Sequence, residues 1–504
     1  MSKPNQSSRD IKKILWTGAN TLRGNVDPSE YKQVFLGLIF LKFISERFER
    51  KYAQLKEEGA GFENDRTEYT SEGIYFVPSD ASWREIATKC STDDVGMFID
   101  HAIHRIEQEN PELKGVLPKY YARAELDKNR LIDLIRLFDE NIDTKTSIVT
   151  LGRVYEYCLM KFAEHEGRRA GEFYTPHSVV RTLAGMVNAR HGRLYDPCCG
   201  SGGLFIAAQQ FAEELGGDKG DLSFYGQESN ATTWKMCLMN LAIHGIEADV
   251  GKYNADTFLQ NLHPNLSADF ILASPPFNMS EWGGEKLWND KRWIFGMPPS
   301  GNANYAWLQH MFAQLSPVGR MGVVLSNGAL TTQNSAEMGI RKKMIEQDLI
   351  ECIVSMPSHL FYNTSIPFSI WLINKEKLPS NRNKILFIDA INMGETLGRA
   401  QKEMRSEEIR KISEKIQILR GEVPDLFYAD EPGFCVLTDI EKIRETDYVL
   451  SPGRYVGIAD PGEEAELHLN ALPDLISELR ELMHENRDLE FELARKLGEL
   501  GYEH

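Results

Sequence analysis

Four consecutive residues, Ser274-Pro275-Pro276-Phe277, directly follow the apolar segment Asp269–Ala273. Two successive prolines cannot continue a central strand, and they fix the directions of the backbone carbonyls. An exocyclic amine on a base is a poor nucleophile, because its lone pair is delocalised into the ring. The Ser274 side chain and the Pro275 carbonyl would accept its two N–H bonds and favour a reactive, tetrahedral nitrogen. The tetrapeptide therefore indicates group transfer to an amine, and this chemistry requires no metal ion.

The aromatic ring of Phe277 adds an indication about the substrate. Enzymes that modify a base take it out of the duplex, and an aromatic face can stack on the extruded base. The alternative is a rigid turn that merely ends a strand, which double prolines often make. That alternative does not explain why the turn follows a glycine-rich loop by about seventy residues.

The glycine-rich loop runs from Asp196 to Gly203 with the sequence D-P-C-C-G-S-G-G, and a predicted helix over 204–215 follows it. Glycines let a ligand approach the backbone and its amides closely. NAD-binding loops have the pattern G-x-G-x-x-G, but Phe205 stands at the third glycine position. The Asp196 carboxylate would repel a pyrophosphate and attract the ammonium of a methionine moiety. We therefore predict S-adenosylmethionine as cofactor, bound by Asp196, Gly200, Ser201, Gly202 and Gly203.

Two further acidic residues follow predicted strands in the order that an adenosine ligand requires. Glu228 ends the second predicted strand, where a carboxylate can accept both ribose hydroxyls. Asp256, followed by Thr257, comes after a third predicted strand and could accept a proton from the adenine amine. Each could instead be a solvated surface carboxylate, but the order of loop, Glu and Asp favours a cofactor site.

Short apolar runs alternate with helix-like segments between about residues 170 and 390. This alternation predicts an α/β fold with a doubly wound, mostly parallel sheet, in which ligands bind at the carboxyl ends of the strands. We therefore expect the loop, Glu228 and the tetrapeptide to meet at one edge. Besides the strand before Asp256, the predicted strands are Arg193–Asp196, Ser223–Glu228, Asp269–Ser274, Arg320–Ser326, Ile350–Met356, Phe368–Asn374 and Ile385–Asp389.

The remaining sequence is mainly helical. We predict a helical N-terminal domain over residues 1–165, the catalytic α/β domain over 166–395 and a helical C-terminal region over 396–504. Apolar residues recur at helical spacing in Tyr31–Arg50, Leu131–Phe138 and Ile148–Glu166. Leucines between residues 474 and 503 approximate a heptad seam, which fits either a partner-binding helix or a helix packed on its own domain.

The overall composition limits the class of protein. No stretch is long and apolar enough to span a membrane, and the N-terminus lacks the apolar part of a signal peptide. Seven scattered cysteines without zinc-ligand spacing indicate reduced thiols and a cytoplasmic protein. The net charge of −17 argues against a protein that grips DNA unaided. It fits an acidic small-molecule enzyme, or a nucleic-acid enzyme with local basic patches or a DNA-binding partner.

Residues 1 to about 460 resemble the modification (M) subunit of type I restriction-modification systems, a family of DNA adenine-N6 methyltransferases. The resemblance covers the glycine loop and the tetrapeptide. It also covers Glu172-Phe173-Tyr174-Thr175-Pro176, which is similar to the segment that closes over the cofactor in this family. It continues through Asn302–Trp307, Gly319–Gly322 and Asp447–Tyr455.

The resemblance implies a larger assembly. It implies that a separate specificity (S) subunit reads the DNA sequence, with two copies of this chain per S subunit and an ATP-driven restriction (R) subunit where cleavage occurs. The substrate would be double-stranded DNA with a flipped target base. The N-terminal domain would then serve as a DNA clamp or in assembly, and the C-terminal helices, including 474–503, would contact the S subunit.

Ser274 departs from the family pattern, which usually has Asn in N-P-P-F. Loss of an aimed acceptor can cost about 3 kcal/mol of transition-state stabilisation. Ser274 could still function, or mark a cytosine-N4 methyltransferase, or mark a catalytically weakened assembly and DNA-clamp subunit. Phe277, where cytosine enzymes often have Tyr, favours adenine. Methylation of protein or RNA is a further alternative, which the helical flanking regions disfavour.

Overall fold

The computed structural model describes residues 8–22, 28–59, 61–91, 94–142, 148–165, 174–361, 365–397 and 401–458, and the isolated helical residues Ser477, Met483 and Lys496. The predicted leucine seam at 474–503 lies outside the described residues, apart from those three positions. Glu172 and Phe173 lie outside them as well. In the part of the chain that is described, no helix is long and apolar enough to cross a membrane.

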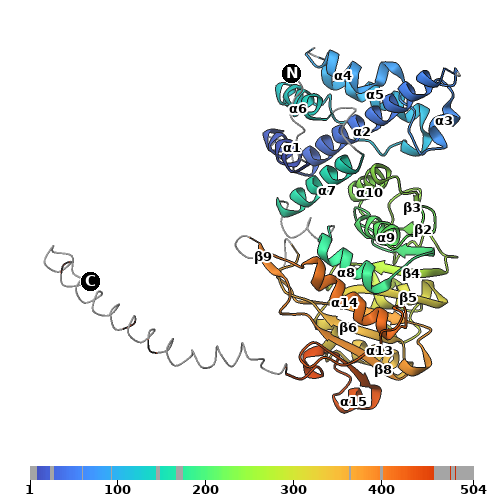
Figure 1. Ribbon diagram of the computed structural model, residues 1–504, viewed down its shortest axis with the longest axis vertical. Coiled ribbons are helices and arrows are strands. Elements are labelled where there is room, and N and C mark those ends of the chain that lie inside the picture. Colours follow the sequence, from blue (N-terminus) through green and yellow to red (C-terminus); the bar gives the residue numbers. More distant parts are fainter. Residues whose placement is uncertain are drawn as a thin grey trace.

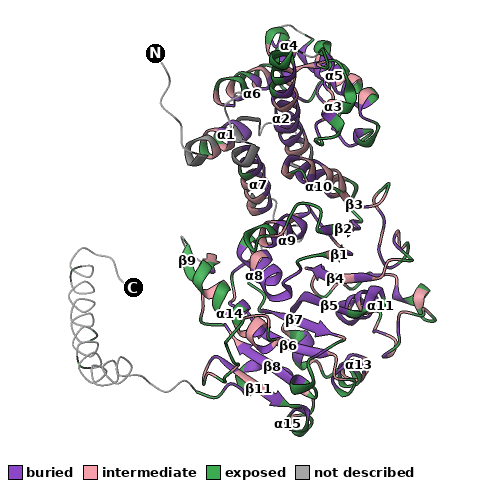
Figure 2. Ribbon diagram, turned by 45° about the vertical axis from the view of Figure 1, so that its right-hand side comes forward, coloured by how far each residue is buried: buried purple, intermediate pink, exposed green. Residues whose placement is uncertain are grey.

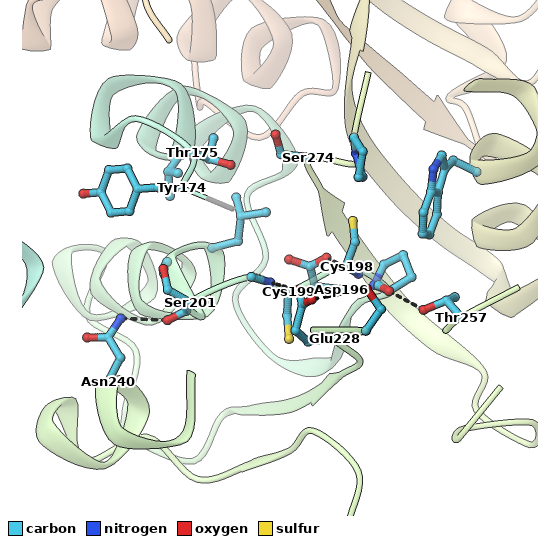
Figure 3. Close-up of a pocket in the computed structure, with 18 of the residues that line it drawn as sticks. Tyr174, Thr175, Asp196, Cys198, Cys199, Ser201, Glu228, Asn240, Thr257 and Ser274 are labelled. Atoms are coloured by element: carbon cyan, nitrogen blue, oxygen red, sulfur yellow. Dashed lines mark hydrogen bonds between the residues drawn. The ribbon is translucent and has the colours of Figure 1, made fainter. Parts of the chain in front are cut away.

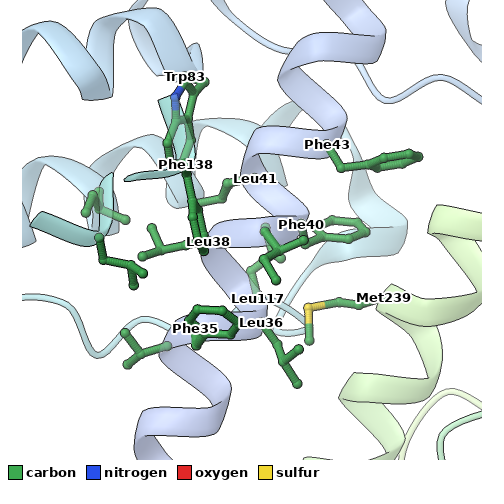
Figure 4. Close-up of a cluster of buried hydrophobic side chains, with 14 of the residues drawn as sticks. Phe35, Leu36, Leu38, Phe40, Leu41, Phe43, Trp83, Leu117, Phe138 and Met239 are labelled. Carbon is green, nitrogen blue, oxygen red and sulfur yellow. The ribbon is translucent and has the colours of Figure 1, made fainter. Parts of the chain in front are cut away.

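The N-terminal part is a group of helices around a hydrophobic core (Figure 1). The longest, α2, places Phe35, Leu38 and Phe43 in this core with 1% or less of their surface exposed (Figure 4). The helices are α1 (Ser8–Leu22), α2 (Pro28–Glu58), α3 (Arg66–Thr70), α4 (Trp83–Lys89), α5 (Val95–Glu109), α6 (Lys128–Asn141) and α7 (Ile148–His165), with short 3-10 helices at Ser79–Ala81 and Pro111–Leu113.

A nine-stranded sheet follows, in the order β11-β8-β6-β7-β5-β4-β1-β2-β3. Five of its strand pairs are parallel and the three that involve β7 or β11 are antiparallel, so the predicted mostly parallel α/β sheet is confirmed. The strands are β1 (Gly192–Asp196), β2 (Leu222–Gly226), β3 (Ala248–Asp249), β4 (Ala268–Ala273), β5 (Leu315–Ser326), β6 (Ile350–Ser355), β7 (Phe368–Asn374), β8 (Lys384–Asp389) and β11 (Cys435–Asp439).

Helices cover both faces of the sheet, because successive side chains of a buried strand point to opposite faces. In β4, Leu272 contributes to the core on one face, whereas Ile271 and Ala273 contribute to the core on the other. Figure 2 shows the strands of the sheet largely buried between the flanking helices. The first face is covered by α8 (His177–Val187), α9 (Gly203–Glu214), α10 (Ala231–His244) and α14 (Ser406–Leu419), and the second by α11 (Asn304–Gln314), α12 (Gly328–Thr331), α13 (Ser335–Glu346) and α15 (Ile440–Glu445).

The sheet extends past residue 395, where the sequence analysis ended the α/β domain. Strand β11 pairs antiparallel with β8 along five residues, from Cys435 opposite Ile388 to Asp439 opposite Lys384. A separate two-stranded hairpin, β9 (Glu395–Leu397) with β10 (Gln401–Glu403), crosses that boundary. The region after 395 therefore contains strands as well as helices, and the boundary at 395 does not coincide with the end of the sheet.

The order of strands sets the position of the site. The chain runs from β1 outward through β2 to β3, and then returns to β4 on the other side of β1. Because β1, β2 and β4 are parallel, their carboxyl ends lie at the same edge. A crevice forms at such a reversal of strand order. The loops that follow Asp196, Gly226 and Ala273 therefore converge there.

Candidate active site

A cavity of about 290 Å³ lies at this reversal of strand order (Figure 3). Eleven of the predicted site residues line it, and they come from loops that are far apart in sequence. They are Tyr174, Thr175, Asp196, Gly200, Ser201, Gly203, Glu228, Asp256, Thr257, Ser274 and Pro276. The structure thus brings together both acidic positions, the glycine loop and the first residue of the tetrapeptide.

Four described site residues do not line this cavity. Gly202 is the loop glycine that packs against α10, and Pro275 is buried. Pro176 is the N-cap of α8 and lines the neighbouring groove. Phe277 packs edge-on against Phe361, with ring centroids 5.4 Å apart, and stacks near Phe368 at 6.3 Å.

The conformation of the glycine loop depends on two left-handed glycines. Gly200 has a φ of 54° and Gly202 a φ of 80°, a region that L side chains rarely adopt. A Cβ on Gly202 would lie 3.1 Å from the Cys237 Sγ, so the loop also packs closely on α10. The Asn240 side chain donates from α10 to the Ser201 carbonyl at 2.8 Å. The loop is therefore held from below while its upper face lines the cavity.

The two carboxylates anchor this loop through backbone amides. The Cys198 N–H donates to the Asp196 Oδ1 at 3.0 Å, and the Gly200 N–H donates to the Glu228 Oε2 at 3.1 Å. Asp196 is 1% exposed, and burial raises its pKa to about 7. Glu228 is 4% exposed, and burial raises its pKa too. Neither forms an ion pair with a described residue, so a bound cation would relieve a real desolvation cost.

The polar and aromatic groups in the cavity wall indicate whether a cationic ligand that carries adenosine would fit. The Asn240 Oδ1 and the Trp307 Nε1 are buried and have no hydrogen-bond partner among the described residues. Phe258, which also lines the cavity, lies 4.2 Å from Trp307 between ring centroids. Buried polar atoms without partners are uncommon in folded proteins. The cavity wall therefore suits the adenine, ribose and ammonium groups of S-adenosylmethionine. It offers aromatic surface, hydrogen-bond acceptors and two carboxylates without an ion-pair partner among the described residues.

Two interactions set the tetrapeptide beside the glycine loop. Cys198 is in hydrogen-bonding range of the Asp196 carboxylate and of the Ser274 backbone amide, and burial raises the pKa of its thiol. The Thr257 hydroxyl donates to the Pro197 carbonyl at 2.5 Å. Because these contacts join the ends of β1 and β4 to the loop after β3, the cofactor loop and Ser274 form one continuous wall.

Asn278, directly after the tetrapeptide, joins three segments of chain. Its φ of 53° is left-handed, and its Oδ1 accepts hydrogen bonds from the Asn304 Nδ2 and the Ser326 Oγ, both at 2.9 Å. Its backbone N–H donates to the Asn304 Oδ1 at 3.1 Å. This network connects the turn after β4 to the start of α11 and the end of β5.

Arg292 makes a second connection, from the segment between β4 and α11 to the loop after β3. Its Nη2 donates to the Phe258 carbonyl at 2.7 Å, and its Nη1 donates to the Thr257 carbonyl at 3.3 Å. Asp290 orients the guanidinium with a hydrogen bond of 2.7 Å. Arg292 therefore holds the backbone beside Asp256.

Several residues that line the cavity, mainly from helices, were not predicted from the sequence. Asn240 and Trp307 belong to α10 and α11, and Glu156 and Leu159 belong to α7 of the N-terminal helices. Trp307 ends a segment that carried the family resemblance, which was a usable signal. Asn240 is a polar residue in an otherwise apolar stretch, and this signal was weaker. Within the described ranges, no group of three His, Cys, Asp or Glu residues is arranged to hold a metal ion.

Fold and site together define a doubly wound α/β protein in which the glycine loop, two buried carboxylates and the tetrapeptide share one cavity. The family model described as N-6 DNA Methylase matches residues 146–464, and the model described as HsdM N-terminal domain matches residues 11–138. The chain belongs to the family of type I restriction-modification methylase subunits, and it is an adenine-N6 DNA methyltransferase. This assignment favours neither of the alternatives that Ser274 raised.

Individual relatives agree with the family models. The HindI methylase subunit of Haemophilus influenzae is 40% identical over 419 residues, which cover 81% of this chain and 93% of that protein. The MjaIX methylase subunit of Methanocaldococcus jannaschii is 36% identical over 518 residues, covering 97% and 91%. The crystal structure of a type I methyltransferase subunit from Streptococcus thermophilus superposes with a TM-score of 0.76 at 25% identity, covering 90% of this chain and all of that one.

Proposed function

We propose that the cavity binds S-adenosylmethionine and that the chain transfers the methyl group to N6 of an adenine flipped out of double-stranded DNA. The observation that carries the proposal is the meeting of Asp196, Glu228 and Ser274 in one cavity. When bound, the cofactor supplies an electrophilic methyl group. The residues of the chain bind the cofactor, orient the amine and exclude water.

Three carboxylates distribute the proposed contacts along the cofactor. Asp196 binds the ammonium, Glu228 accepts the ribose hydroxyls and Asp256 accepts from the adenine amine. The Asp256 Oδ1 already accepts from the Phe258 N–H at 2.8 Å, which fixes the direction of the carboxylate. Tyr174 and Thr175 line the opposite side of the cavity. By resemblance, they belong with Glu172, Phe173 and Pro176 to a segment that closes over the cofactor.

The tetrapeptide orients the adenine amine in this proposal. The Ser274 Oγ and the Pro275 carbonyl accept its two N–H bonds, so the lone pair is directed away from the ring and toward the methyl group. Positive charge develops on the nitrogen during transfer, and fixed acceptors stabilise it without reorganising. Phe277 stacks on the flipped base, and its contacts with Phe361 and Phe368 hold the ring in one orientation.

We propose that the chain acts in an assembly with an S subunit that reads the DNA sequence, two copies of this chain and, where cleavage occurs, an R subunit. The net charge of −17 supports a DNA-gripping partner, because phosphate contacts need Lys and Arg. The N-terminal helices would serve as a clamp or in assembly, and residues 470–504 would contact the S subunit. All seven cysteines are free thiols, which supports the cytoplasm as the compartment.

The proposal is tested by co-expressing the chain with its neighbouring S subunit and mapping modified bases in the cellular DNA. We expect N6-methyladenine at one defined sequence, and binding of S-adenosylmethionine by the purified complex in calorimetry. Methylation at cytosine N4, or a complex that binds no S-adenosylmethionine, would contradict it.

Substitutions at Ser274 test the proposed role of its hydroxyl. We expect Ser274→Ala to lower kcat by about 10²-fold, since it removes an aimed acceptor, while the Kd for S-adenosylmethionine changes less than about threefold. Ser274→Asn restores a planar amide and should methylate at least as fast as the parent. If Ser274→Ala retains full kcat, the hydroxyl has no role in orienting the amine.

A further inference from the structure

Glu156 brings a charged group from the N-terminal helices to the cofactor cavity. It lies on α7, and with Leu159, about one turn further along, it lines the cavity. It also lines the groove beside the cavity, as do Tyr174 and His177. Glu156 therefore stands where the cavity opens into the groove, and no role in the proposed reaction has used it.

The carboxylate of Glu156 is largely enclosed, and among the described residues it has no charged contact partner. Its side chain is 26% exposed, and its closest basic atom among the described ion pairs is the His244 Nε2 at 3.7 Å. Burial lowers the pKa of His244 to about 4, so this ring is neutral near pH 7. The His244 Nε2 has no hydrogen-bond partner in the described structure. Within the described part of the chain, no contact neutralises this carboxylate directly.

Other charged groups act on Glu156 from a greater distance. Lys12 on α1 and Arg153 on α7 lower the pKa of Glu156, but burial outweighs both and raises it to about 7. His177 on α8 lines the same opening, and burial lowers its pKa as well. Asp196, which lines the same cavity, is a second buried carboxylate whose pKa is raised to about 7. The free protein therefore holds two incompletely ionised acids around this space near neutral pH.

The position of Glu156 indicates which end of the proposed cofactor would lie next to it. The proposed adenine and ribose contacts, Asp256 and Glu228, belong to the loops after β3 and β2. Glu156 instead shares the opening with Tyr174 and His177, from the segment before α8 and its first turn. The amino-acid end, whose ammonium is proposed to bind Asp196, remains for this side of the cavity, so Glu156 would be a second carboxylate for the same ammonium. Its ammonium is a cation that a carboxylate binds, and Lys12 and Arg153 in the adjoining groove offset repulsion of its own carboxylate.

We infer that Glu156 is a cofactor-binding residue, supplied by the N-terminal helices, that recognises the ammonium of the amino-acid end of S-adenosylmethionine. The inference rests on the proposed cofactor. It has a consequence for the whole chain, because a ligand contact on α7 couples cofactor binding to the seating of the N-terminal helices on the sheet. A cation also favours the ionised acid, so binding near pH 7 releases protons.

Calorimetry on the full chain tests this role with three ligands. S-adenosylmethionine and S-adenosylhomocysteine carry the ammonium, whereas 5′-methylthioadenosine lacks the amino-acid end. We expect Glu156→Gln to weaken the first two by about tenfold or more and to change 5′-methylthioadenosine less than twofold. Glu164→Gln is the matched control on the same helix. Glu164 lines only the groove and pairs with Lys161 at 2.6 Å, so its three affinities should stay unchanged.

Proton release provides a second readout. At pH 7, titrations in buffers of different ionisation enthalpy should show fewer protons released by Glu156→Gln than by the parent, with the Asp196 contribution remaining in both. At pH 8.5 the difference should vanish, because both acids are already ionised. Equal affinities and equal proton release in parent and variant would overturn the inference. An equal loss for all three ligands would also overturn it, since that pattern indicates a collapsed cavity. A parent that binds no S-adenosylmethionine would instead contradict the proposed function.

Discussion

At the scale of single residues, the site combines groups that are costly to bury. Asp196 is 1% exposed, and its hydrogen bond from the Cys198 N–H does not compensate for the lost solvation, so its pKa rises to about 7. A buried acid of this kind lowers the stability of the free protein and is relieved when a cation binds. On the proposed function, binding of the cationic cofactor offsets this cost of burial.

The desolvation cost of the Asp196 carboxylate predicts the effect of Asp196→Asn on the free energy of unfolding. A carboxyl whose pKa is raised on folding binds protons more tightly in the folded protein, so stability falls as pH rises from about 4 to about 7. Above pH 7 the full penalty is present. We expect Asp196→Asn to stabilise the ligand-free chain by roughly 2–4 kcal/mol at pH 8 and to leave it unchanged near pH 4. Urea unfolding at the two pH values measures the difference.

The same substitution at an exposed acid is the control. Asp133 on α6 is exposed, and Asp133→Asn should change stability by less than about 0.5 kcal/mol at either pH. Calorimetry should show that Asp196→Asn weakens binding of S-adenosylmethionine. An Asp196→Asn chain that is less stable than the parent at pH 8 would contradict the assignment of a desolvation penalty.

Residue types and spacing were sufficient to predict the cavity-lining residues that follow strands and carry carboxylate or hydroxyl groups. Asp196, Glu228 and Ser274 each follow a strand, and parallel strands bring their ends together. The packing of Phe277 was not accessible, because its partners Phe361 and Phe368 are about ninety residues away in sequence. Glu156 was not accessible either, since a carboxylate on a helix is usually solvated.

At the scale of elements, the turn after β4 is shaped by side chains from two other segments. Asn278 reverses the chain with a left-handed φ, and its Oδ1 accepts from Asn304 at the start of α11 and from Ser326 at the end of β5. Asn304 is 1% exposed and Ser326 is 2% exposed, so these hydrogen bonds are shielded from water. They fix where Pro275 and Ser274 present their oxygens.

Two substitutions at Asn278 separate the backbone from the side chain. Asn278→Gly permits the left-handed φ but removes the acceptor, whereas Asn278→Asp tolerates the φ and keeps an acceptor. We expect Asn278→Gly to lower kcat about tenfold or more, since the tetrapeptide loses its position, with the Kd for S-adenosylmethionine within about twofold. Asn278→Asp should retain most of the activity. If Asn278→Gly matches the parent in kcat, only the backbone conformation matters there.

The strands were predictable from the sequence where each forms an uninterrupted run of apolar residues. All seven strands that were predicted with residue ranges are present, because strands buried on both faces form apolar runs. The edge strand β11 was missed, since Val436 and Leu437 are half-buried and the run is only five residues long. Its pairing depends on β8, about fifty residues earlier, and the local sequence carries no signal of that contact.

At the scale of the whole molecule, α10 belongs to two cores. Met236, Met239 and Ile243 pack into the core of the N-terminal helices, whereas Cys237 and Leu241 pack into a core of the sheet. Figure 4 shows Met239 of α10 at the edge of the N-terminal cluster. The same helix carries Asn240, which supports the glycine loop. The helical part and the sheet therefore share a structural element directly beneath the cofactor cavity, which the division into domains from sequence does not express.

The shared helix predicts that the two parts unfold together. Met239 is 1% exposed and Leu241 is 3% exposed, on opposite faces of α10, so Met239→Ala and Leu241→Ala should each cost about 2–5 kcal/mol. If α10 couples the cores, scanning calorimetry will show one transition, and both substitutions will lower its temperature. Hydrogen exchange should then show that Met239→Ala loosens strands β1 and β2 as well as the N-terminal helices. Two transitions, with Met239→Ala shifting only one, would mean that α10 joins two independent units, and cofactor binding could not then stabilise the N-terminal helices through it.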